Sequence, residues 1–294
     1  MGARIGVGLL GLGTVGGGVA EILLNPEERH PLVADLDLIR VAVRDVNRPR
    51  TVELADAVLT TDPSEVVNDP NVDVVVEVIG GIEPARSLIL QAIANGKSVV
   101  TANKAVIARH GPEIASAAKA AGVYVLIEAA VGGGIPIIEP LKQSLGGNRI
   151  NRVSGIINGT TNYILTRMAN EGAAYADVLA EAQRLGYAEA DPAADVDGLD
   201  AADKIAILSA LAFGGTVDRD ALPTTGISAL QGRDVEYARQ LGYGVKLLAV
   251  AERLAGQGDP LPLSLRVQPT LVPSDHPLAG VNGVNNAILV EGDP

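Results

Sequence analysis

The residues best placed to do chemistry are Asp200 and Lys204, with the lysine directly before a run without charges, Ile205–Phe213. A carboxylate and an ammonium four residues apart share one face of a helix, where a surface ion pair is worth roughly a few tenths of a kcal/mol. A helix that is apolar all round is usually buried. An ammonium at the start of such a helix can stabilise an oxygen that gains negative charge and then give it a proton. We therefore favour a functional pair over a surface ion pair.

Other acidic residues cluster in the segment before this helix, among them Glu189 and Asp195. A solvated loop, with carboxylates favoured by the dipole at a helix N-terminus, accounts for Asp191, Asp197 and Asp203.

A glycine pattern near the N-terminus predicts a dinucleotide site. An apolar strand, Ile5–Leu9, is expected before Gly11, Gly13 and Gly16, and a helix is expected from about Val15 to Leu24. The first glycine permits a tight turn, the second lets backbone approach a pyrophosphate, and the third lets helix and strand pack closely. The helix N-terminus offers free N–H groups to the phosphates.

The rest of the first half alternates between apolar strands and helices, which is typical of a parallel sheet covered on both faces. We expect an α/β fold in which a Rossmann-type doubly wound parallel sheet, residues 1–130, precedes an α+β substrate and dimerisation domain, residues 131–294. The expected strands of the first domain are 36–45, 72–81, 97–104 and 123–131, with helices between Pro84 and Gly96 and near 112–121.

The second half has a different pattern, with a glycine-rich turn, several helices and few strands. A helix is expected after Pro136, a second after a polar turn that follows a strand at about 152–157, and a third that ends at Gly186. The apolar helix after Lys204 and strands at 261–272 and 285–293 complete the predicted domain.

The cofactor type should be decided where the second strand ends, at Arg44 and Asp45. A carboxylate there binds the ribose hydroxyls of NAD, whereas an arginine accommodates the extra phosphate of NADP. Arg44 comes first, so NADP is favoured. The alternative is a solvated Arg44 with Asp45 as the ribose ligand of NAD.

Composition narrows the function classes. A net charge of −12 over 294 residues, without a basic stripe, argues against a nucleic-acid surface. No apolar stretch is long enough for a membrane span, so a cytoplasmic protein is expected. The absence of cysteine excludes thiolate metal sites and thiol nucleophiles, and therefore aldehyde oxidation through a thioester.

Five segments, in order along the chain, resemble homoserine dehydrogenases. They are GLGTVG at 11–16, TANK at 101–104, EAAVGGGIPII at 128–138, NGTTNYIL at 158–165 and GYAEADPAADVDGLDAADK at 186–204. The resemblance implies reversible, NAD(P)-dependent reduction of L-aspartate 4-semialdehyde to L-homoserine, a step towards threonine, methionine and isoleucine. It also implies a homodimer formed through the second domain.

The resemblance implies roles for individual residues. Lys204 would be the catalytic acid and base, and Lys104, on the loop after a strand, would lie near the nicotinamide and the substrate. Asp200 and Glu189 would hold the substrate's amino group and hydroxyl region. The other substrate positions are Tyr187, Asp195, Gly159 and Thr160. The nucleotide positions are Gly11, Leu12, Gly13, Thr14, Val15, Gly16, Arg44, Gly80, Thr101 and Lys104.

A cation site is implied at Glu128, Val131, Gly133 and Ile135, whose backbone oxygens hold a sodium-like ion in the family. Carbonyl ligands suit only a hard, oxygen-loving ion. The alternative for 131–135 is a glycine hinge between the two domains.

Two other functions stay open at this stage. The chain ends at NNAILVEGDP, where family members continue with a glycine-rich stretch, a returning helix and often a regulatory domain. Feedback control through that domain is therefore not predicted, and a nucleotide-binding sensor or an inactive truncated subunit is one alternative. The other is an NAD(P) dehydrogenase for a different small substrate.

Overall fold

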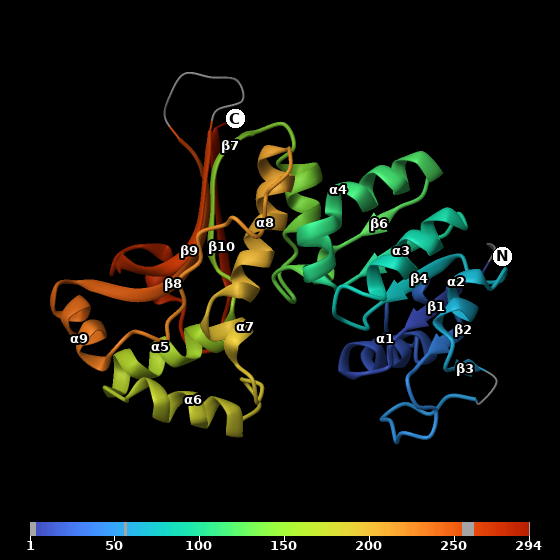
Figure 1. Ribbon diagram of the computed structural model, residues 1–294, viewed down its shortest axis with the longest axis horizontal. Helices are drawn as coiled ribbons and strands as arrows, with labels where there is room; N and C mark the ends of the chain where they lie inside the picture. Colours follow the sequence, from blue (N-terminus) through green and yellow to red (C-terminus); the bar gives the residue numbers. More distant parts are fainter. Residues whose placement is uncertain (1–3, 56–57, 255–261, 294) are drawn as a thin grey trace. The chain divides into compact units, whose positions relative to one another are not determined.

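Valine-rich and isoleucine-rich strands in the first part of the chain form a parallel sheet with the order β3-β2-β1-β4-β5-β6 (Figure 1). This order confirms the predicted doubly wound fold, and it reverses direction between β1 and β4, where such sheets bind ligands. The strands are β1 (Ile5–Leu10), β2 (Leu36–Ala42), β3 (Leu59–Thr60), β4 (Val74–Glu77), β5 (Ser98–Thr101) and β6 (Val125–Leu126). The helices are α1 (Thr14–Leu24), α2 (Pro63–Asn68), α3 (Ala85–Ala94) and α4 (Lys104–Ala121).

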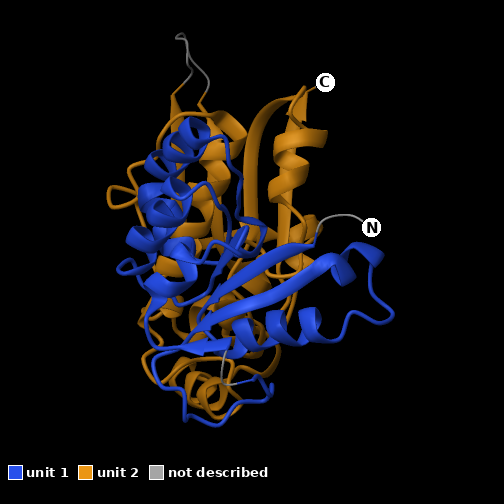
Figure 2. Ribbon diagram, turned by 90° about the vertical axis from the view of Figure 1, so that its right-hand side faces the viewer, with its two compact units in different colours: residues 1–130 blue, residues 131–294 orange. Residues whose placement is uncertain are grey.

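The structure, a computed structural model, describes residues 4–55, 58–254 and 262–293. Its chain divides into two compact units, unit 1 (Met1–Ala130) and unit 2 (Val131–Pro294), which Figure 2 colours separately.

Each of the glycines Gly11, Gly13 and Gly16 suits its position between β1 and α1 for a different physical reason. Gly11 has a φ of +103°, which favours glycine. A Cβ on Gly16 would lie 2.1 Å from the carbonyl oxygen of Gly11, so only glycine lets α1 begin this close to the end of β1. Gly13 has no atom within 4 Å of its Cβ position, which leaves open space for a ligand to approach its backbone.

Several expected elements of unit 1 are wrong in their limits; the strands expected at 72–81 and 97–104, for example, are only Val74–Glu77 and Ser98–Thr101. The helix expected at 112–121 begins at Lys104, because the side chain of Asn103 caps it by accepting from the Val106 N–H at 3.3 Å, and Pro112 lies inside the helix. The strand expected at 123–131 is only β6, at the edge of the sheet, and Glu128–Ala130 form a 3-10 turn. The strand expected at 36–45 ends at Ala42.

Unit 2 contains an antiparallel sheet with the order β10-β7-β8-β9. Its strands are β7 (Arg149–Ile156), β8 (Tyr243–Arg253), β9 (Leu263–Pro273) and β10 (Ala287–Asp293). Residue 261, included in the strand predicted at 261–272, lies outside the described residues. The helices are α5 (Gly159–Glu171), α6 (Tyr175–Arg184), α7 (Ala193–Val196), α8 (Leu199–Phe213) and α9 (Gly232–Gln240), of which α5, α8 and α9 pack against the sheet (Figure 1).

The largest omission of the sequence analysis is the central strand β8, which pairs with both β7 and β9. Residues 245–251 are all buried, so the strand is apolar on both faces apart from Lys246. A run of this kind cannot be distinguished from a buried helix by its periodicity. The helix expected after Pro136 contains only a short π-helical turn, Pro140–Ser144.

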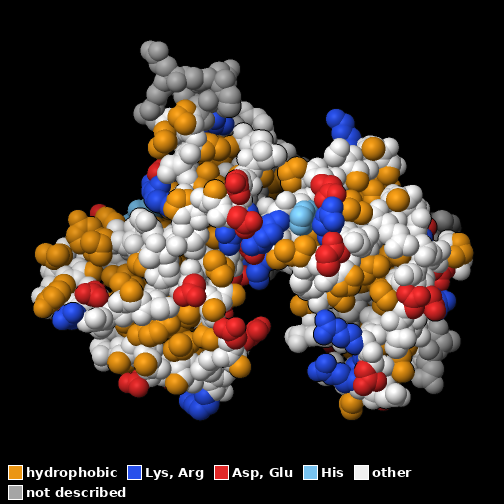
Figure 3. All heavy atoms as spheres, in the orientation of Figure 1, with side chains coloured by type: hydrophobic (Ala, Val, Ile, Leu, Met, Phe, Trp, Pro, Cys, Tyr) orange, Lys and Arg blue, Asp and Glu red, His pale blue; other side chains and the backbone are white. Residues whose placement is uncertain are grey.

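Helix α8 confirms the predicted buried apolar helix, since Ile205–Leu208 are almost inaccessible to solvent. It is not a membrane span, because none of the described helices is long and apolar enough to cross a bilayer. Figure 3 shows acidic and basic side chains interspersed on the face in view.

The packing of Gly16 predicts a large effect of one methyl group. Gly16→Ala should destabilise unit 1 by about 1–3 kcal/mol, because the new Cβ would overlap the Gly11 carbonyl. Gly18→Ala is the matched control. Gly18 is exposed in the same helix, and no atom lies within 4 Å of its Cβ position, so alanine should stabilise unit 1 by up to ~1 kcal/mol. Urea unfolding of both variants measures the difference, and equal midpoints would refute the close contact.

Candidate active site

The Asp200–Lys204 pair forms as predicted, on the first turns of α8. Lys204 Nζ donates to Asp200 Oδ2 at 2.7 Å and to the Ile157 carbonyl oxygen at 2.7 Å. The lysine side chain is 15% exposed and the aspartate side chain 6%, so the pair is largely buried and the lysine side chain keeps some access to solvent. Among the described residues no third oxygen accepts from Nζ, which leaves one N–H available to a substrate.

Asn158, the residue before α5, joins two of the predicted carboxylates. Its Nδ2 donates to Asp195 Oδ1 at 2.7 Å and to Asp200 Oδ2 at 3.0 Å. Its Oδ1 accepts from the backbone N–H and the hydroxyl of Thr161, both at 2.9 Å. All four hydrogen-bonding positions of the carboxamide are therefore used, which fixes the orientation of both aspartates relative to Lys204.

A second contact ties the predicted substrate turn to the acidic segment. Thr160 Oγ1 donates to the Tyr187 carbonyl oxygen at 2.6 Å, and the rings of Tyr163 and Tyr187 meet edge to face, 5.1 Å apart. Gln183 Nε2 donates to the backbone oxygen of Glu189 at 3.1 Å, which holds this segment while the Glu189 side chain stays exposed. The structure thus joins Thr160 to Tyr187, and Asp195, Asp200 and Lys204 through Asn158.

The structure contradicts the prediction that Asp203 is a solvated carboxylate at the N-terminus of a helix. It is 7% exposed, and its Oδ1 accepts from Arg219 Nε at 2.6 Å. Arg219 Nη2 also donates to the Leu199 carbonyl oxygen at 2.9 Å, so this buried ion pair anchors the start of α8.

Unit 1 has a pocket of about 410 Å³ at the carboxyl ends of its strands. The predicted nucleotide residues Gly11, Leu12, Gly13, Arg44 and Gly80 line it. Thr14, Val15, Gly16, Thr101 and Lys104 are not among the lining residues; Thr101 is fully buried and Gly16 packs under the turn. The size, the uncapped start of α1 and the open space at Gly13 fit a dinucleotide.

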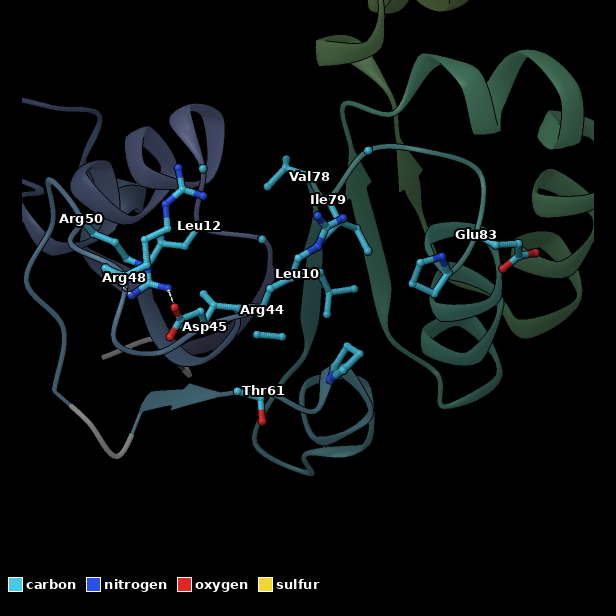
Figure 4. A pocket seen from close by; sticks show the side chains of 17 residues that line it. Leu10, Leu12, Arg44, Asp45, Arg48, Arg50, Thr61, Val78, Ile79 and Glu83 are labelled. Atoms are coloured by element: carbon cyan, nitrogen blue, oxygen red, sulfur yellow. Dashed lines mark hydrogen bonds between the residues drawn. The ribbon is translucent and has the colours of Figure 1, made fainter.

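The side of the pocket that follows β2 carries three guanidinium groups, Arg44, Arg48 and Arg50, of which Arg48 and Arg50 lie beside Asp45 in Figure 4. Arg50 donates to the backbone oxygens of Asp45, Val46 and Arg48, which braces the loop. Asp45 Oδ1 accepts from the Asn47 N–H at 2.9 Å, so one of its oxygens is occupied within the loop.

A buried carboxylate, Glu77 at the end of β4, organises the neighbouring loops. It accepts from the hydroxyl of Thr101 at 2.6 Å and from the Ile79 N–H at 2.9 Å. Asn103 Nδ2 donates to the Gly81 carbonyl oxygen at 2.7 Å. Lys104, expected on a loop, is instead the first residue of α4, directly after the Asn103 cap.

The four residues of the predicted cation site lie in two consecutive turns. Glu128 belongs to the 3-10 turn Glu128–Ala130. Val131, Gly133 and Ile135 belong to a glycine turn closed by the Ile135 N–H, which donates to the Gly132 carbonyl oxygen at 3.0 Å. No cluster of three metal-binding His, Cys, Asp or Glu side chains occurs in the described chain.

Comparison with known proteins identifies the family. The sequence model of homoserine dehydrogenase matches residues 136–294, and that of the homoserine dehydrogenase NAD-binding domain matches residues 11–128. The chain belongs to the homoserine dehydrogenase family. It is 62% identical to the homoserine dehydrogenase of Synechocystis over 98% of this chain and 66% of that protein. It thus spans just under two thirds of that relative.

Solved structures of the family agree with the fold. A homoserine dehydrogenase from Thiobacillus denitrificans matches with a TM-score of 0.89 and 52% identity, over 99% of this chain and 66% of that chain. A hyperthermophilic archaeal homoserine dehydrogenase in complex with NADPH matches with a TM-score of 0.79 and 28% identity, over 99% of this chain and 88% of that chain.

Some functional candidates of this family member escaped the sequence analysis. Asn158 stands in the NGTTNYIL motif, and an asparagine before a helix suggests a cap, but no local pattern indicates its bonds to two distant aspartates. Arg48 and Arg50 follow Arg44 closely in the sequence, and this group of three arginines after the second strand is the signal that indicates them.

The saturated bonds of Asn158 predict the effect of an isosteric change. Asn158→Asp keeps the helix cap, because aspartate is an equally good N-cap, but replaces two donated hydrogen bonds by repulsion from Asp195 and Asp200. We expect a loss of about 1–3 kcal/mol of stability at pH 7.

Like charges raise the pKa of this new carboxyl in the folded state, so its penalty should shrink as pH falls from 7 to 5. Urea unfolding of wild type and variant at both pH values measures the difference. A deficit that stays constant with pH would contradict the arrangement.

Proposed function

We propose that the chain catalyses the NAD(P)H-dependent reduction of L-aspartate 4-semialdehyde to L-homoserine, and the reverse reaction. The observation that carries this proposal is the largely buried Lys204 side chain, whose ammonium is held by two oxygens and has one N–H available. Membership of the homoserine dehydrogenase family supports the choice of substrate.

The nicotinamide cofactor, when bound, supplies the hydride for the aldehyde carbon. Lys204 donates its available N–H to the aldehyde oxygen, stabilises the negative charge that develops there, and transfers the proton. Asp200 and the Ile157 carbonyl oxygen keep Nζ in place during this transfer. In the reverse direction a neutral Lys204 amine accepts the hydroxyl proton.

The substrate's own charges need partners of opposite sign. Glu189, with an exposed carboxylate on a segment fixed by Gln183, is suited to bind the substrate ammonium. Asp195 and the Gly159–Thr160 turn are assigned to the same site, because Asn158 and Thr160 hold them next to the Asp200 and Tyr187 segments.

Removal of the amine tests the mechanism. Lys204→Ala should lower kcat for semialdehyde reduction at least about 1,000-fold, since it removes both charge stabilisation and proton transfer. NADPH binding, measured by fluorescence titration, should stay unchanged, and Lys119→Ala at an exposed site of α4 is the control.

The same assay separates the alternatives. Wild-type turnover with other short aldehydes but not with the semialdehyde would indicate a different dehydrogenase. Cofactor binding without turnover of any aldehyde would indicate a sensor or an inactive subunit.

We infer that NADP is preferred to NAD. Three arginines at the pocket favour the extra phosphate, and one oxygen of Asp45, the ribose ligand expected for NAD, is already bound to Asn47. The NADPH bound to the archaeal relative is in line with this choice.

Cofactor preference can be tested at Arg44. Arg44→Ala should raise KM for NADPH roughly 10–100-fold, the worth of a charge-assisted bond to phosphate, and leave KM for NADH nearly unchanged. Steady-state assays with both cofactors measure this. Equal losses with NADPH and NADH would assign Arg44 to a general rather than a phosphate-specific role.

The remaining proposals rest on the resemblance to the family. A sodium-like cation is assigned to the backbone oxygens of Glu128, Val131, Gly133 and Ile135, to be tested by the dependence of activity on sodium. A homodimer through unit 2 is to be tested by sedimentation. A cytoplasmic location suits a cysteine-free biosynthetic enzyme.

A further inference from the structure

A second buried lysine of unit 2, Lys246 on β8, has no place in the proposed mechanism. It is 4% exposed, and its Nζ donates to the Val281 carbonyl oxygen at 2.6 Å, to Asn282 Oδ1 at 3.0 Å and to Asn162 Oδ1 at 3.3 Å. All three acceptors are neutral, and no carboxylate within the described ranges forms an ion pair with it. Burial of an ammonium without a carboxylate partner costs free energy, so we ask which structural role offsets that cost.

The acceptors of Lys246 connect residues 281–285, the segment before β10, to helix α5. Asn162 Nδ2 donates to the carbonyl oxygens of Val281 at 3.2 Å and Asn285 at 3.0 Å. The Gly283 N–H donates to Thr166 Oγ1 at 3.0 Å. The segment is therefore bound along two turns of α5, and Lys246 closes the network from the sheet side.

The same segment lies directly on the first residue of α5. A Cβ on Gly159 would be 2.8 Å from the Val284 carbonyl oxygen, so the backbone of the segment touches the turn that begins α5. The chain neighbours of Gly159 are Asn158 and Thr160, which bond to Asp195, Asp200 and the Tyr187 carbonyl oxygen.

We propose that Lys246 is a positioning residue, which holds segment 281–285 against α5 and so fixes the Gly159–Thr160 turn of the site. The link from this turn to substrate binding rests on the proposed function, whereas the link from Lys246 to the turn does not.

Two opposing effects act on the ammonium. Three donated hydrogen bonds favour the charged form, since a neutral amine has only two N–H bonds for three oxygens. Burial favours the neutral form and prevails, because it lowers the pKa of Lys246 to about 8. Charged groups on the elements packed against Lys246 have other partners: Arg167 with Glu171 and Glu181, Arg266 with Glu252, Arg239 with Glu236, Arg253 with the Ile150 carbonyl oxygen, and His276 with the Leu278 N–H.

Opening of the segment would expose Lys246 and return its pKa towards 10.5. The closed form binds fewer protons than the open form between these values, so the closed form gains stability as pH rises through about 8. From pH 7 to pH 9 the opening equilibrium should fall about tenfold.

Hydrogen exchange of the wild-type chain and of Lys246→Met tests the positioning role. Methionine has a similar length but no donor, so protection of the first-turn amides of α5 should fall at least about tenfold at pH 7. The rise in protection between pH 7 and pH 9 should disappear. Lys97→Met is the matched control, because Lys97 is equally buried in unit 1 and donates to the carbonyl oxygens of Asp69 and Val72.

Asn282→Ala is a second, milder variant that tests the same network if Lys246→Met does not fold. Asn282 is exposed, and its loss removes one of the three acceptors, so protection should fall less but the pH dependence should remain. Unchanged α5 protection in a folded Lys246→Met, or in Asn282→Ala where that is the folded variant, would overturn the proposal.

Steady-state kinetics test whether Lys246 also affects the proposed substrate site. Lys246→Met should raise KM for the semialdehyde about tenfold without a change in the NADPH dissociation constant. An unchanged KM, with turnover intact, would overturn the effect of the turn on substrate. If the wild type turns over no aldehyde, the proposed function fails, and the exchange measurements still decide the role of Lys246.

Discussion

One carboxamide, that of Asn158, determines how the polar groups of unit 2 are arranged. Its donors meet Asp195 and Asp200 and its oxygen accepts from Thr161, so exchange of its nitrogen and oxygen would turn the amide oxygen towards two carboxylates and the NH2 towards the Thr161 N–H. A network in which each member is satisfied has one geometry, and a partly satisfied one is costly. The position of Lys204 follows from it, because Asp200 is shared between the amide and the ammonium.

In unit 1 the loops are ordered in a similar way, by a buried carboxylate. Glu77 is fully buried at the end of β4, and its bonds to Thr101 and Ile79 order the loops after two neighbouring strands. Loops at the carboxyl ends of parallel strands usually carry the function of such sheets. In each unit, therefore, a buried polar side chain at or next to a strand end orders the loops that carry the candidate ligand-binding residues, while the hydrophobic core fixes the strands.

The sequence predicts what depends on local spacing and misses what depends on distant partners. The glycine turn and the Asp200–Lys204 pair are local features, and both were predicted. The central strand β8 was missed because its apolar run has no alternation, and Asp203 was assigned to solvent because its partner Arg219 lies sixteen residues away. The limits of α4 depended on a local cap, Asn103, whose signal was available in the sequence.

Lys204 and Lys246 show why residue type alone does not identify a candidate catalytic group. Both are lysines of unit 2 with mostly buried side chains and bonds to backbone oxygens. Lys204 has a carboxylate partner, and its two hydrogen bonds leave one N–H for another molecule, as the proposed mechanism requires. Lys246 has neutral acceptors for all its N–H bonds, so it can hold a segment but has no N–H to give a substrate. The distinction comes from the partners that the fold brings to each ammonium.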